Sequence, residues 1–476
     1  MRILMLGWEF PPFVAGGLGV ACFGLTKALD KAGHHVIFIL PKPVDNSHSS
    51  HVRLLAPRAM RSGASGGGVP QMSDLIDEAG MPLFGFQHAV FKGVPASFSS
   101  PYPAFDPANF VRLTGGDAAS ASALAASGGE GVPSFSTFDP APPMSREAPA
   151  APAGFIGTGG GPGIGYGMDL VGDSERYARL VVALAAREQF DVIHAHDWLT
   201  YPAGIALSKV TGKPLIVQVH STEFDRAGNN VNQRVYDIER AGMNSADRVI
   251  AVSQMTKSIC VRRYAVRPDH IDVVYNGVER EVQQPREGER IESTDKIVLF
   301  LGRITMQKGP EYFIAAAKRV LEKLQNVKFV LAGSGDMALR MIELAASMGI
   351  GHKVLFTGFL RGRDVDRVFQ MADCYVMPSV SEPFGIAALE AISHDVPVIL
   401  SKTSGASEVL THVLKVDFWD IDEMANKILA VLRHPPLSQT LRQHGAFELH
   451  RLTWDGAAER CVLSYDKAIG QRAAQT

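Results

Sequence analysis

The chain has 476 residues, of which 46% are hydrophobic and 20% are charged, as is typical of two or three globular domains. Its formal net charge of −2 argues against a protein that binds nucleic acid through a basic surface. Four scattered cysteines without a CxxC pair argue against a disulfide scaffold or a zinc ribbon. No apolar run is long enough for a transmembrane helix, so we expect a cytoplasmic protein, and a peripheral membrane contact stays open.

Two blocks of the chain alternate short apolar runs with amphipathic helical patterns. The first block begins with an apolar segment, 1–7, which we interpret as a strand rather than a signal peptide. A helix from about Gly17 to Ala32 and further strands near 36–40, 192–195, 215–219 and 249–252 follow. The second block has strands near 297–301, 328–332, 354–357, 374–377 and 398–400. This alternation predicts an α/β fold with two doubly wound, Rossmann-like domains.

The segment 92–168 breaks the alternation. It has 8 charged residues among 77, and 25 of the 77 are glycine or proline. Such a composition predicts a low-complexity insertion that is disordered or loosely packed. A flap on the acceptor side of a cleft is the alternative interpretation. The polar stretch 279–296 is interpreted as the linker between the two domains.

Polar residues that directly follow the predicted strands are the candidate site residues, because open parallel sheets bind ligands beyond the carboxyl ends of their strands. Gly16 and Gly17 open the first helix, where free N–H groups and the helix dipole favour an anion. The alternative for them is a turn that only packs. His196 and Asp197 follow the strand at 192–195 and suit the polar floor of a cleft. A metal pair of His194 and His196, or a capping role for Asp197, is the alternative.

A second histidine follows the next strand. His220 precedes Ser221, Thr222 and Glu223, and can exchange hydrogen bonds with a sugar hydroxyl. The alternative for this group is a polar cluster at the start of a helix.

Two cations and two glycine-rich turns follow strands of the second block. Arg303 comes after Gly302, and Lys308 lies five residues further on, so that a guanidinium fork and an ammonium flank the turn into a helix. Gly333 and Gly335 form another such turn. Both turns are compatible with a bound diphosphate. A solvated surface lysine is the alternative for Lys308.

The most specific pattern follows the strand at 374–377. Glu382 and Glu390 stand eight residues apart, across a loop that enters a helix. The helix opens with Phe384-Gly385-Ile386, whose N–H groups could stabilise an anion. A glutamate is otherwise a poor choice in the apolar run around Glu390, which favours a binding role for both carboxylates. Two exposed carboxylates are the alternative interpretation.

These motifs together carry a resemblance. The segment Glu382–Glu390 matches the E-x7-E motif of retaining GT-B glycosyltransferases, and Gly302-Arg303 with Lys308-Gly309 resembles their diphosphate-binding turn. His196-Asp197-Trp198 and Gly16-Gly17-Leu18 resemble segments of glycogen and starch synthases. The resemblance covers about 1–40 and 170–470.

The resemblance implies the GT-B architecture and its domains. It implies an N-terminal acceptor-side domain at 1–280 that contains the insertion, and a nucleotide-sugar domain at 281–453. A C-terminal helix at 454–476 would return to the first domain. The donor would be a nucleotide sugar such as ADP-glucose or UDP-glucose and the acceptor a carbohydrate, with no nucleic acid, metal or other cofactor needed.

The roles of individual residues are implied in the same way. Arg303 and Lys308 would hold the diphosphate, and Gly17 would contact it through its N–H. Glu390 would bind the ribose, while Glu382 would sit by the hydroxyls of the donor sugar. His220 would contact that sugar near the reacting carbon, and Asp197 would lie near the acceptor or the donor sugar. The other donor-binding positions would be backbone groups of the turns and of the helix start: Gly16, Gly302, Gly333, Gly335, Phe384, Gly385 and Ile386.

One departure leaves the donor open. Glycogen and starch synthases carry K-T-G-G in the first loop, where this chain has Val14-Ala15-Gly16-Gly17. The missing lysine is associated with ADP-glucose, so the donor sugar and nucleobase are not fixed, and neither are the acceptor and the oligomeric state. We expect an α-glucan synthase relative. The alternatives are a transferase for cell-surface or capsular polysaccharide or a small glycoside, a GT-B-fold epimerase or phosphorylase, and a non-catalytic paralogue.

Overall fold

A computed structural model describes residues 1–10, 16–41, 88–93, 170–279 and 295–474. The predictions made for Val14 and Ala15, for the insertion from 94 to 168 and for the linker from 280 to 294 lie outside these residues. No helix in the described ranges is long and apolar enough to cross a membrane.

The first sheet is entirely parallel and has seven strands in the order β3-β2-β1-β4-β5-β6-β7. The chain therefore leaves β1 in one direction as far as β3, and then returns to the other side of β1 at β4. This reversal is the switch point at which doubly wound sheets bind ligands. The strands are β1 (Arg2–Leu6), β2 (His35–Leu40), β3 (Ala89–Gly93), β4 (Val192–His196), β5 (Leu215–Val219), β6 (Arg248–Ala251) and β7 (Ile271–Val273).

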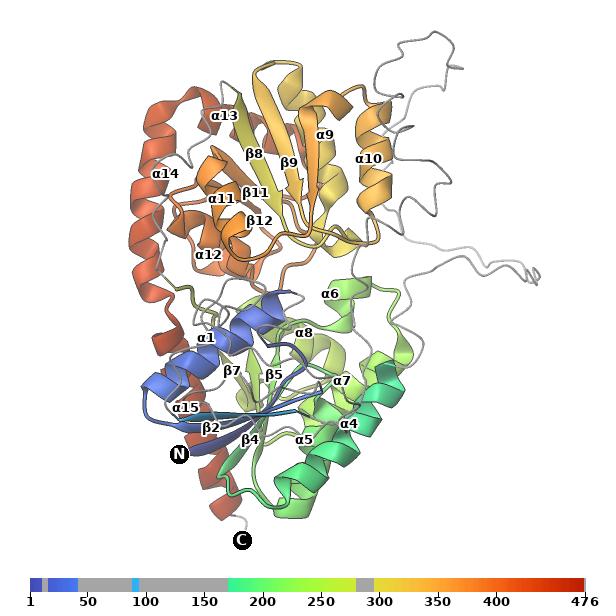
Figure 1. Ribbon diagram of the computed structural model, residues 1–476, viewed down its shortest axis with the longest axis vertical. Helices are drawn as coiled ribbons and strands as arrows, with labels where there is room; N and C mark the ends of the chain where they lie inside the picture. The colour runs from blue at the N-terminus through green and yellow to red at the C-terminus, as the bar shows by residue number, and fades with distance from the viewer. Residues whose placement is uncertain (11–15, 42–87, 94–169, 280–294, 475–476) are drawn as a thin grey trace, which may run out of the picture. The chain divides into compact units, whose positions relative to one another are not determined.

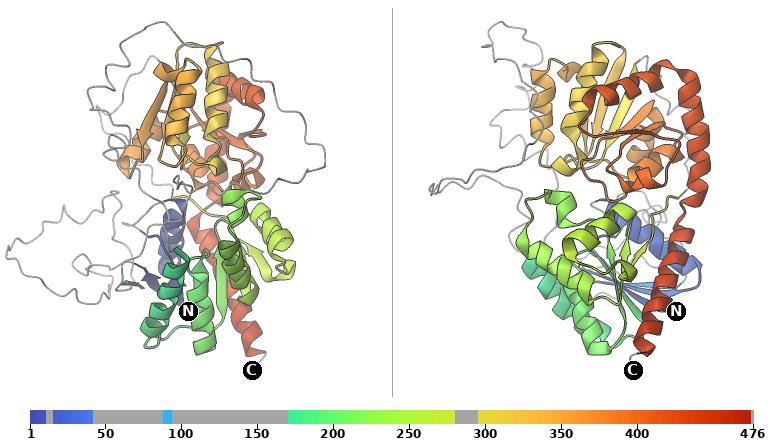
Figure 2. Two further views of the ribbon diagram at one scale, coloured as in Figure 1. Left: turned by 90° about the vertical axis from the view of Figure 1, so that its right-hand side faces the viewer. Right: turned by 180° about the vertical axis from the view of Figure 1, so that it is seen from behind.

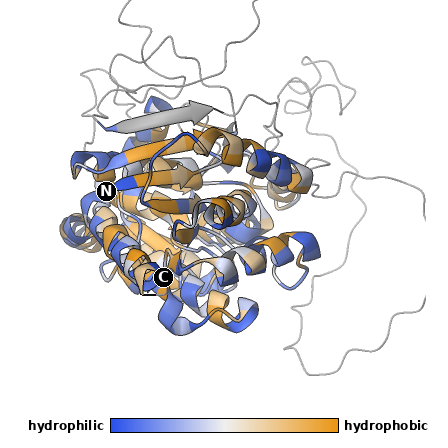
Figure 3. Ribbon diagram, turned by 90° about the horizontal axis from the view of Figure 1, so that it is seen from below, coloured by the Kyte–Doolittle hydropathy of each residue, from blue (hydrophilic) through white to orange (hydrophobic). Residues whose placement is uncertain are grey.

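Helices cover both faces of this sheet (Figure 1). They are α1 (Gly17–Lys31), α4 (Leu170–Ala185), α5 (Tyr201–Thr211), α6 (Glu223–Ala227), α7 (Gln233–Ser245) and α8 (Gln254–Tyr264). The strands between them are almost continuous runs of aliphatic side chains, as both faces of a covered parallel sheet require. In Figure 3, the hydrophobic colour accordingly lies mainly on the strands and on the inner sides of the helices.

The second sheet repeats the plan with six parallel strands in the order β10-β9-β8-β11-β12-β13. Its switch point lies between β8 and β11. The strands are β8 (Lys296–Leu301), β9 (Val327–Ala332), β10 (Val354–Gly358), β11 (Cys374–Met377), β12 (Val398–Ser401) and β13 (Leu414–Val416). The helices are α9 (Pro310–Leu321), α10 (Ala338–Ser347), α11 (Arg363–Met371), α12 (Ile386–Ser393), α13 (Ile421–Arg433) and α14 (Pro435–Glu448).

The last helix, α15 (Trp454–Ala473), packs against the first sheet rather than the second (Figure 2). Its Trp454 lies over Gly24 of α1, where a Cβ would approach the indole ring to 2.2 Å. Further along, the Tyr465 hydroxyl is 2.8 Å from Nδ1 of His194 on β4. The predicted return of the C-terminal helix to the first sheet is therefore confirmed.

The two Rossmann-like sheets are also confirmed, and every predicted strand is present to within one residue at either end. Three short strands were missed: β3, β7 and β13. Lys92 and Gly93, at the approximate start expected for the insertion, pair with β2 as the end of β3. Edge strands of three to five residues carry too short an apolar pattern to be distinguished from a loop.

Candidate active site

The turn after β8 is packed against the loop after β11, the neighbouring strand at the switch point. Lys308 ends a short 3-10 turn, and Gly309 follows it with φ +64°. A Cβ at Gly309 would approach the carbonyl oxygen of Pro378 to 2.3 Å. Glycine is therefore required here both for the left-handed backbone and for the close approach of the two loops.

This close approach brings Lys308 to Glu382. The Lys308 Nζ donates to Glu382 Oε2 at 2.5 Å, and the Ser379 hydroxyl donates to the same oxygen at 3.1 Å. The lysine side chain is 19% exposed and the glutamate side chain 8%, so a charged group on a ligand could reach the ammonium from solvent. Two residues predicted for one site from separate motifs are thus in direct contact.

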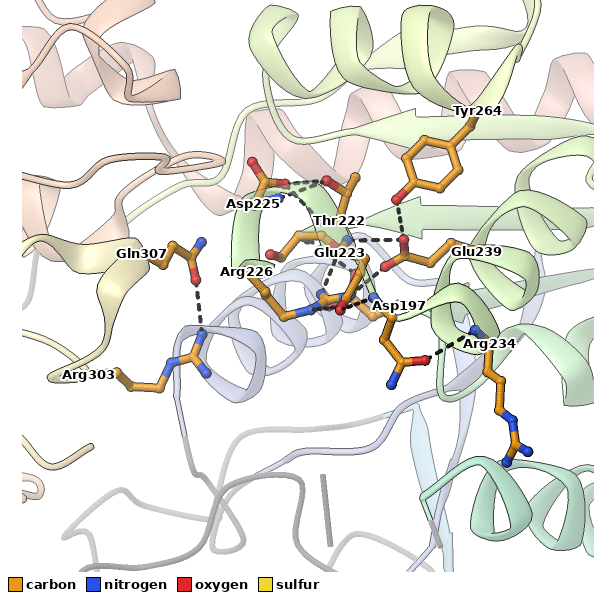
Figure 4. Close-up of polar contacts among 12 residues, drawn as sticks. Asp197, Thr222, Glu223, Asp225, Arg226, Arg234, Glu239, Tyr264, Arg303 and Gln307 are labelled. Atoms are coloured by element: carbon orange, nitrogen blue, oxygen red, sulfur yellow. Dashed lines mark hydrogen bonds and ion pairs between the residues drawn. The ribbon is translucent and has the colours of Figure 1, made fainter. Parts of the chain in front are cut away.

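Arg303 connects to the same loop through one intermediate. Its guanidinium donates to Oε1 of the buried Gln307 at 3.5 Å (Figure 4). The Gln307 carbonyl in turn accepts from the backbone N–H of Val380 at 2.9 Å. Both candidate phosphate ligands therefore belong to one connected group of turns at the carboxyl ends of β8 and β11.

The glycines Gly333 and Gly335 have a packing role that the sequence did not reveal. A Cβ on Gly333 would lie 1.9 Å from the Gly302 carbonyl oxygen, and one on Gly335 would lie 2.2 Å from the Ile304 carbonyl oxygen. The turns after β8 and β9 thus touch backbone to backbone. Their glycines shape the site whether or not they contact a ligand themselves.

Replacing Gly333 with alanine is expected to destabilise the protein by about 3 kcal/mol or more, since φ of +143° disfavours any side chain and the new Cβ would collide with backbone. Gly349→Ala is the matched control, because its φ is +71° and no described residue lies within 4 Å of the Cβ position. The control should cost about 1 kcal/mol. Urea unfolding of both variants measures the difference, and equal losses would show that the contact between the turns is not tight.

The helix α12 begins at the end of the second loop. Gly385 has φ +107°, and Ile386 is the first helical residue. The N–H of Ala388 donates to the Gly385 carbonyl at 3.1 Å, so Ile386 and Ala387 are the first-turn residues whose N–H groups have no partner within the helix. This positive helix end is suited to an anion. The Phe384 side chain is buried and packs against the Tyr275 ring, with centroids 6.0 Å apart, so it belongs to the core rather than to a ligand-facing surface.

Glu390 lies one turn further along α12. Burial raises the pKa of its carboxyl to about 7; the His394 charge lowers that pKa and the nearby Asp366 raises it. His394 is itself held by the Glu390 carbonyl and by Asp366. Within the described ranges the Glu390 carboxylate has no hydrogen-bond partner, so it remains available to a ligand.

In the first sheet, α1 presents its N-terminus near the end of β1. Gly16 is the N-cap and Gly17 the first helical residue, with no acidic side chain in the first turn. Among the described residues, none lies within 4 Å of a Cβ placed on either glycine. The N–H groups of this helix start suit an anion.

Asp197 follows β4 with φ +59°, a conformation that is uncommon for aspartate. Its Oδ1 accepts from the backbone N–H of His220 at 2.7 Å and from that of Ser221 at 3.4 Å. Burial raises the pKa of Asp197 to about 7, although the Arg226 charge and these N–H groups lower it. One carboxylate oxygen thus fixes the loop after β5, which brings Asp197 and His220 together as the sequence predicted.

The side chain of His220 points inward from that loop. Its Nε2 lies 3.0 Å from Nδ1 of His196, and burial lowers the pKa of His220 to about 3. Only its Nδ1 is left for a ligand. His196, which the sequence suggested as cleft floor, is fully buried instead, and that interpretation is wrong.

A buried ion-pair network beside this loop escaped the sequence analysis. The Arg226 guanidinium lies between Glu223 and Glu239, at 3.1 Å and 2.5 Å, as Figure 4 shows. Asp225 forms a capping box with Thr222 and accepts from the Ser381 hydroxyl, at 2.6 Å, in the loop before α12. The pattern Thr-x-x-Asp was a usable signal for the cap, whereas nothing local predicts a partner 156 residues away.

The described residues hold no group of three or more histidine, cysteine, aspartate or glutamate side chains arranged to bind a metal ion. The rings of His194 and His196 are tilted by 30° with centroids 4.2 Å apart, and no third ligand among the described residues joins them. The alternative of a metal pair therefore finds no support in their arrangement.

Three family models match successive parts of the chain. They describe the starch synthase catalytic domain at residues 2–115, Glycosyltransferase Family 4 at 145–282, and glycosyl transferases group 1 at 281–446.

Curated relatives agree with these models. An uncharacterized glycosyltransferase of Methanocaldococcus jannaschii is 35% identical over 300 residues, which are 59% of this chain and 76% of that one. A D-inositol 3-phosphate glycosyltransferase of Segniliparus rotundus is 26% identical over 58% of this chain and 66% of its own length. A glycogen synthase of Mycobacterium tuberculosis is 25% identical over 86% of this chain and 80% of its own length.

Solved structures show the same fold. A sucrose-phosphate synthase from Thermosynechococcus elongatus superposes with a TM-score of 0.67 at 19% identity, over 99% of this chain and 100% of that one. The Anabaena protein HepE, solved with UDP and glucose, superposes with a TM-score of 0.63 at 16% identity, over 98% and 99% of the two chains.

Proposed function

The chain belongs to the group 1 glycosyltransferases of GT-B fold, and we propose that it transfers glucose from a nucleotide diphosphate sugar to an α-glucan with retention of the anomeric configuration. The observation that carries the proposal is the contact between Lys308 and Glu382 beside the open N-terminus of α12. A cation and a helix end together suit a diphosphate, and the neighbouring carboxylate suits the hydroxyls of its sugar.

In this proposal the two sheets divide the work. The group of turns around Lys308 and Arg303 binds the donor, while Asp197 and His220 of the first sheet contact the sugar or the acceptor. We assign the acceptor side to residues 1–280, the donor side to 281–453 and the returning helix to 454–476. Similarity to a glycogen synthase along 86% of the chain supports an α-glucan acceptor.

The reaction exchanges one bond at the sugar C1 for another on the same face. The bond from C1 to the phosphate oxygen breaks, and the bond from C1 to the acceptor oxygen forms. The proton of the acceptor hydroxyl leaves with the diphosphate. Negative charge grows on the departing phosphate, and Lys308, Arg303 and the first turn of α12 would stabilise it. In the free protein Lys308 is paired with Glu382, so the diphosphate would have to share or replace that partner.

ADP-glucose and UDP-glucose are the donors to test first. HepE was solved with UDP and glucose, and the relatives include glycogen synthases, so both nucleobases are reasonable probes. The test incubates each donor with maltoheptaose and follows chain extension by mass spectrometry and the new linkage by NMR. An α-linked extended glucan supports the proposal, whereas a β-linkage or extension from neither donor would reject it.

A second candidate is transfer to a small acceptor, because an inositol-phosphate glycosyltransferase is among the relatives. The polar loop beside His220 gives little support to a phosphorylated acceptor there. Its arginine, Arg226, is already held by two buried glutamates. Including myo-inositol 1-phosphate and simple alcohols in the acceptor screen separates the two functions.

Nucleotide binding is expected to strengthen as pH rises through about 7. The Glu390 pKa lies near 7 in the empty protein, and only the ionised carboxylate can accept from two ribose hydroxyls. Binding then lowers that pKa, so a proton is released near neutral pH. Calorimetry of UDP and ADP at pH 6 and 8 measures this effect, and Glu390→Gln should remove the pH dependence. An unchanged slope in that variant would place the titrating group elsewhere.

We also propose that catalysis needs no metal or other cofactor, since cations and helix ends of the chain itself can neutralise the leaving group. Activity is therefore expected to survive an excess of EDTA with less than a twofold change. Dialysed enzyme with and without added Mg²⁺ or Mn²⁺ provides the measurement. A complete loss that either metal restores would contradict the prediction.

A further inference from the structure

Two buried histidines and a partly buried one, His220, lie in a row at the candidate site. His194 and His196 are two residues apart on β4, and their rings lie side by side, tilted by 30° with centroids 4.2 Å apart. His220 follows β5, the neighbouring strand, and its Nε2 lies 3.0 Å from Nδ1 of His196. At the other end of the row, Nδ1 of His194 lies 2.8 Å from the hydroxyl of Tyr465 on α15.

The contact between His196 and His220 joins two neutral rings. Burial lowers the pKa of His220 to about 3 and that of His196 well below its usual value. Each neutral imidazole carries one proton on one of its two nitrogens. The short distance therefore requires that either His196 Nδ1 or His220 Nε2 bears the shared proton, but not both.

The second nitrogen of His196 decides between these two arrangements. Its Nε2 is buried and has no hydrogen-bond partner among the described residues, and the ring faces Phe38, with centroids 6.5 Å apart. If His220 donated to His196, the proton of His196 would sit on this Nε2 as an unpaired buried N–H. If His196 donates, only a bare acceptor is left there. Unpaired buried N–H groups are rarer and less tolerated than unpaired acceptors.

We propose that His196 is a positioning residue, which donates from Nδ1 to Nε2 of His220 and thereby fixes His220 as the tautomer with its proton on Nδ1. His220 then meets the substrate as a hydrogen-bond donor, aimed at an oxygen of the sugar or the diphosphate. It has no basic nitrogen free to remove a proton from the acceptor. This inference rests on the proposed function, because it assigns how a residue of that site acts.

The tautomer can be read directly in the protein without substrate. Two-dimensional ¹H–¹⁵N spectra of histidine-labelled protein at pH 7.5 distinguish a protonated ring nitrogen from a bare one. We expect Nδ1 to be the protonated nitrogen in both His196 and His220. The His220→Asn and His196→Asn spectra assign the two signals among the 15 histidines of the chain. Protonation of His220 on Nε2 in the unaltered protein would overturn the proposal by itself.

Three variants then test what the contact does. His196→Leu removes the donor, whereas His196→Asn keeps an amide N–H near the position of Nδ1. His194→Leu is the matched control, since it removes a buried histidine of the same strand that makes no hydrogen bond to His220. We expect His196→Leu to lower kcat about tenfold with KM for the donor within twofold. His196→Asn should recover most of that loss, and His194→Leu should stay within twofold of the unaltered enzyme in kcat.

The outcomes remain separable. If His196→Leu unfolds, the spectra of the unaltered protein and of His196→Asn still decide the tautomer. If kcat falls equally in His196→Leu and His194→Leu, the histidines act only through packing and the positioning role is rejected. If the protein transfers no sugar to any acceptor, the proposed function fails, but the tautomer measurement stands independently.

Discussion

Lys308→Ala is expected to lower kcat by about 10²-fold or more, which corresponds to roughly 3 kcal/mol of transition-state stabilisation. The ammonium lies at the junction of two turns where a diphosphate would depart, and charge on that group grows as the bond to C1 breaks. Removing a group that stabilises the transition state more than the bound donor lowers kcat rather than raising KM alone. Initial rates over a range of donor concentrations separate the two effects.

Lys402→Ala is the matched control for this variant. Lys402 belongs to the same half of the chain and also pairs with a carboxylate, Asp417 at 2.7 Å, but its side chain is largely exposed. Its loss should leave kcat within twofold. Arg303→Ala is expected to resemble Lys308→Ala. Near-normal turnover of either site variant with an accepted donor would remove that residue from the diphosphate clamp.

The fold was largely predictable because its signals are local. Apolar runs of four to six residues mark the central strands of both sheets, and glycine-led helix starts mark the turns between them. The same locality explains why three strands were not predicted. β7 and β13 have only three residues each, and β3 is not flanked by predicted helices. Such edge strands are defined by pairing with a neighbour, which a single sequence does not display.

The candidate site could be proposed from the sequence as a set of residues but not as a set of contacts. Separate motifs suggested Lys308 and Glu382, yet their ion pair depends on Gly309 packing against the Pro378 carbonyl. His196 could not be assigned to the core from the sequence. The order of apolar and polar residues along β4 is the same whether the face that carries His196 is fully or only half buried. The burial of polar side chains depends on tertiary packing, so sequence patterns alone do not predict it.

The structure also changes how the glycines of the site are understood. Gly333 and Gly335 were predicted as donor-binding residues from their place in a turn. Their missing side chains are already required by the backbone of the neighbouring turn, which approaches within contact distance. A binding role is therefore unnecessary to explain them. No described residue lies within 4 Å of the Cβ positions of Gly16 and Gly17, so access for a ligand stays the simpler explanation there.

His220→Ala is expected to reduce sugar transfer by about 10³-fold or more while the affinity for UDP or ADP stays within a few-fold, because the proposed diphosphate contacts come from the turns of the second sheet. The loss should appear in kcat, since the Nδ1–H group of His220 would contact the reacting sugar rather than the nucleotide.

His220→Asn, which retains an N–H donor, should recover part of the activity. His270→Ala, a half-buried histidine of the same half of the chain, should behave like the unaltered enzyme. Calorimetry gives the nucleotide affinity, and a chromatographic assay gives the rate of glucan extension. A variant that lost nucleotide affinity but turned over normally at saturating donor would show that His220 binds the nucleotide, and the division of roles between the two sheets would be wrong.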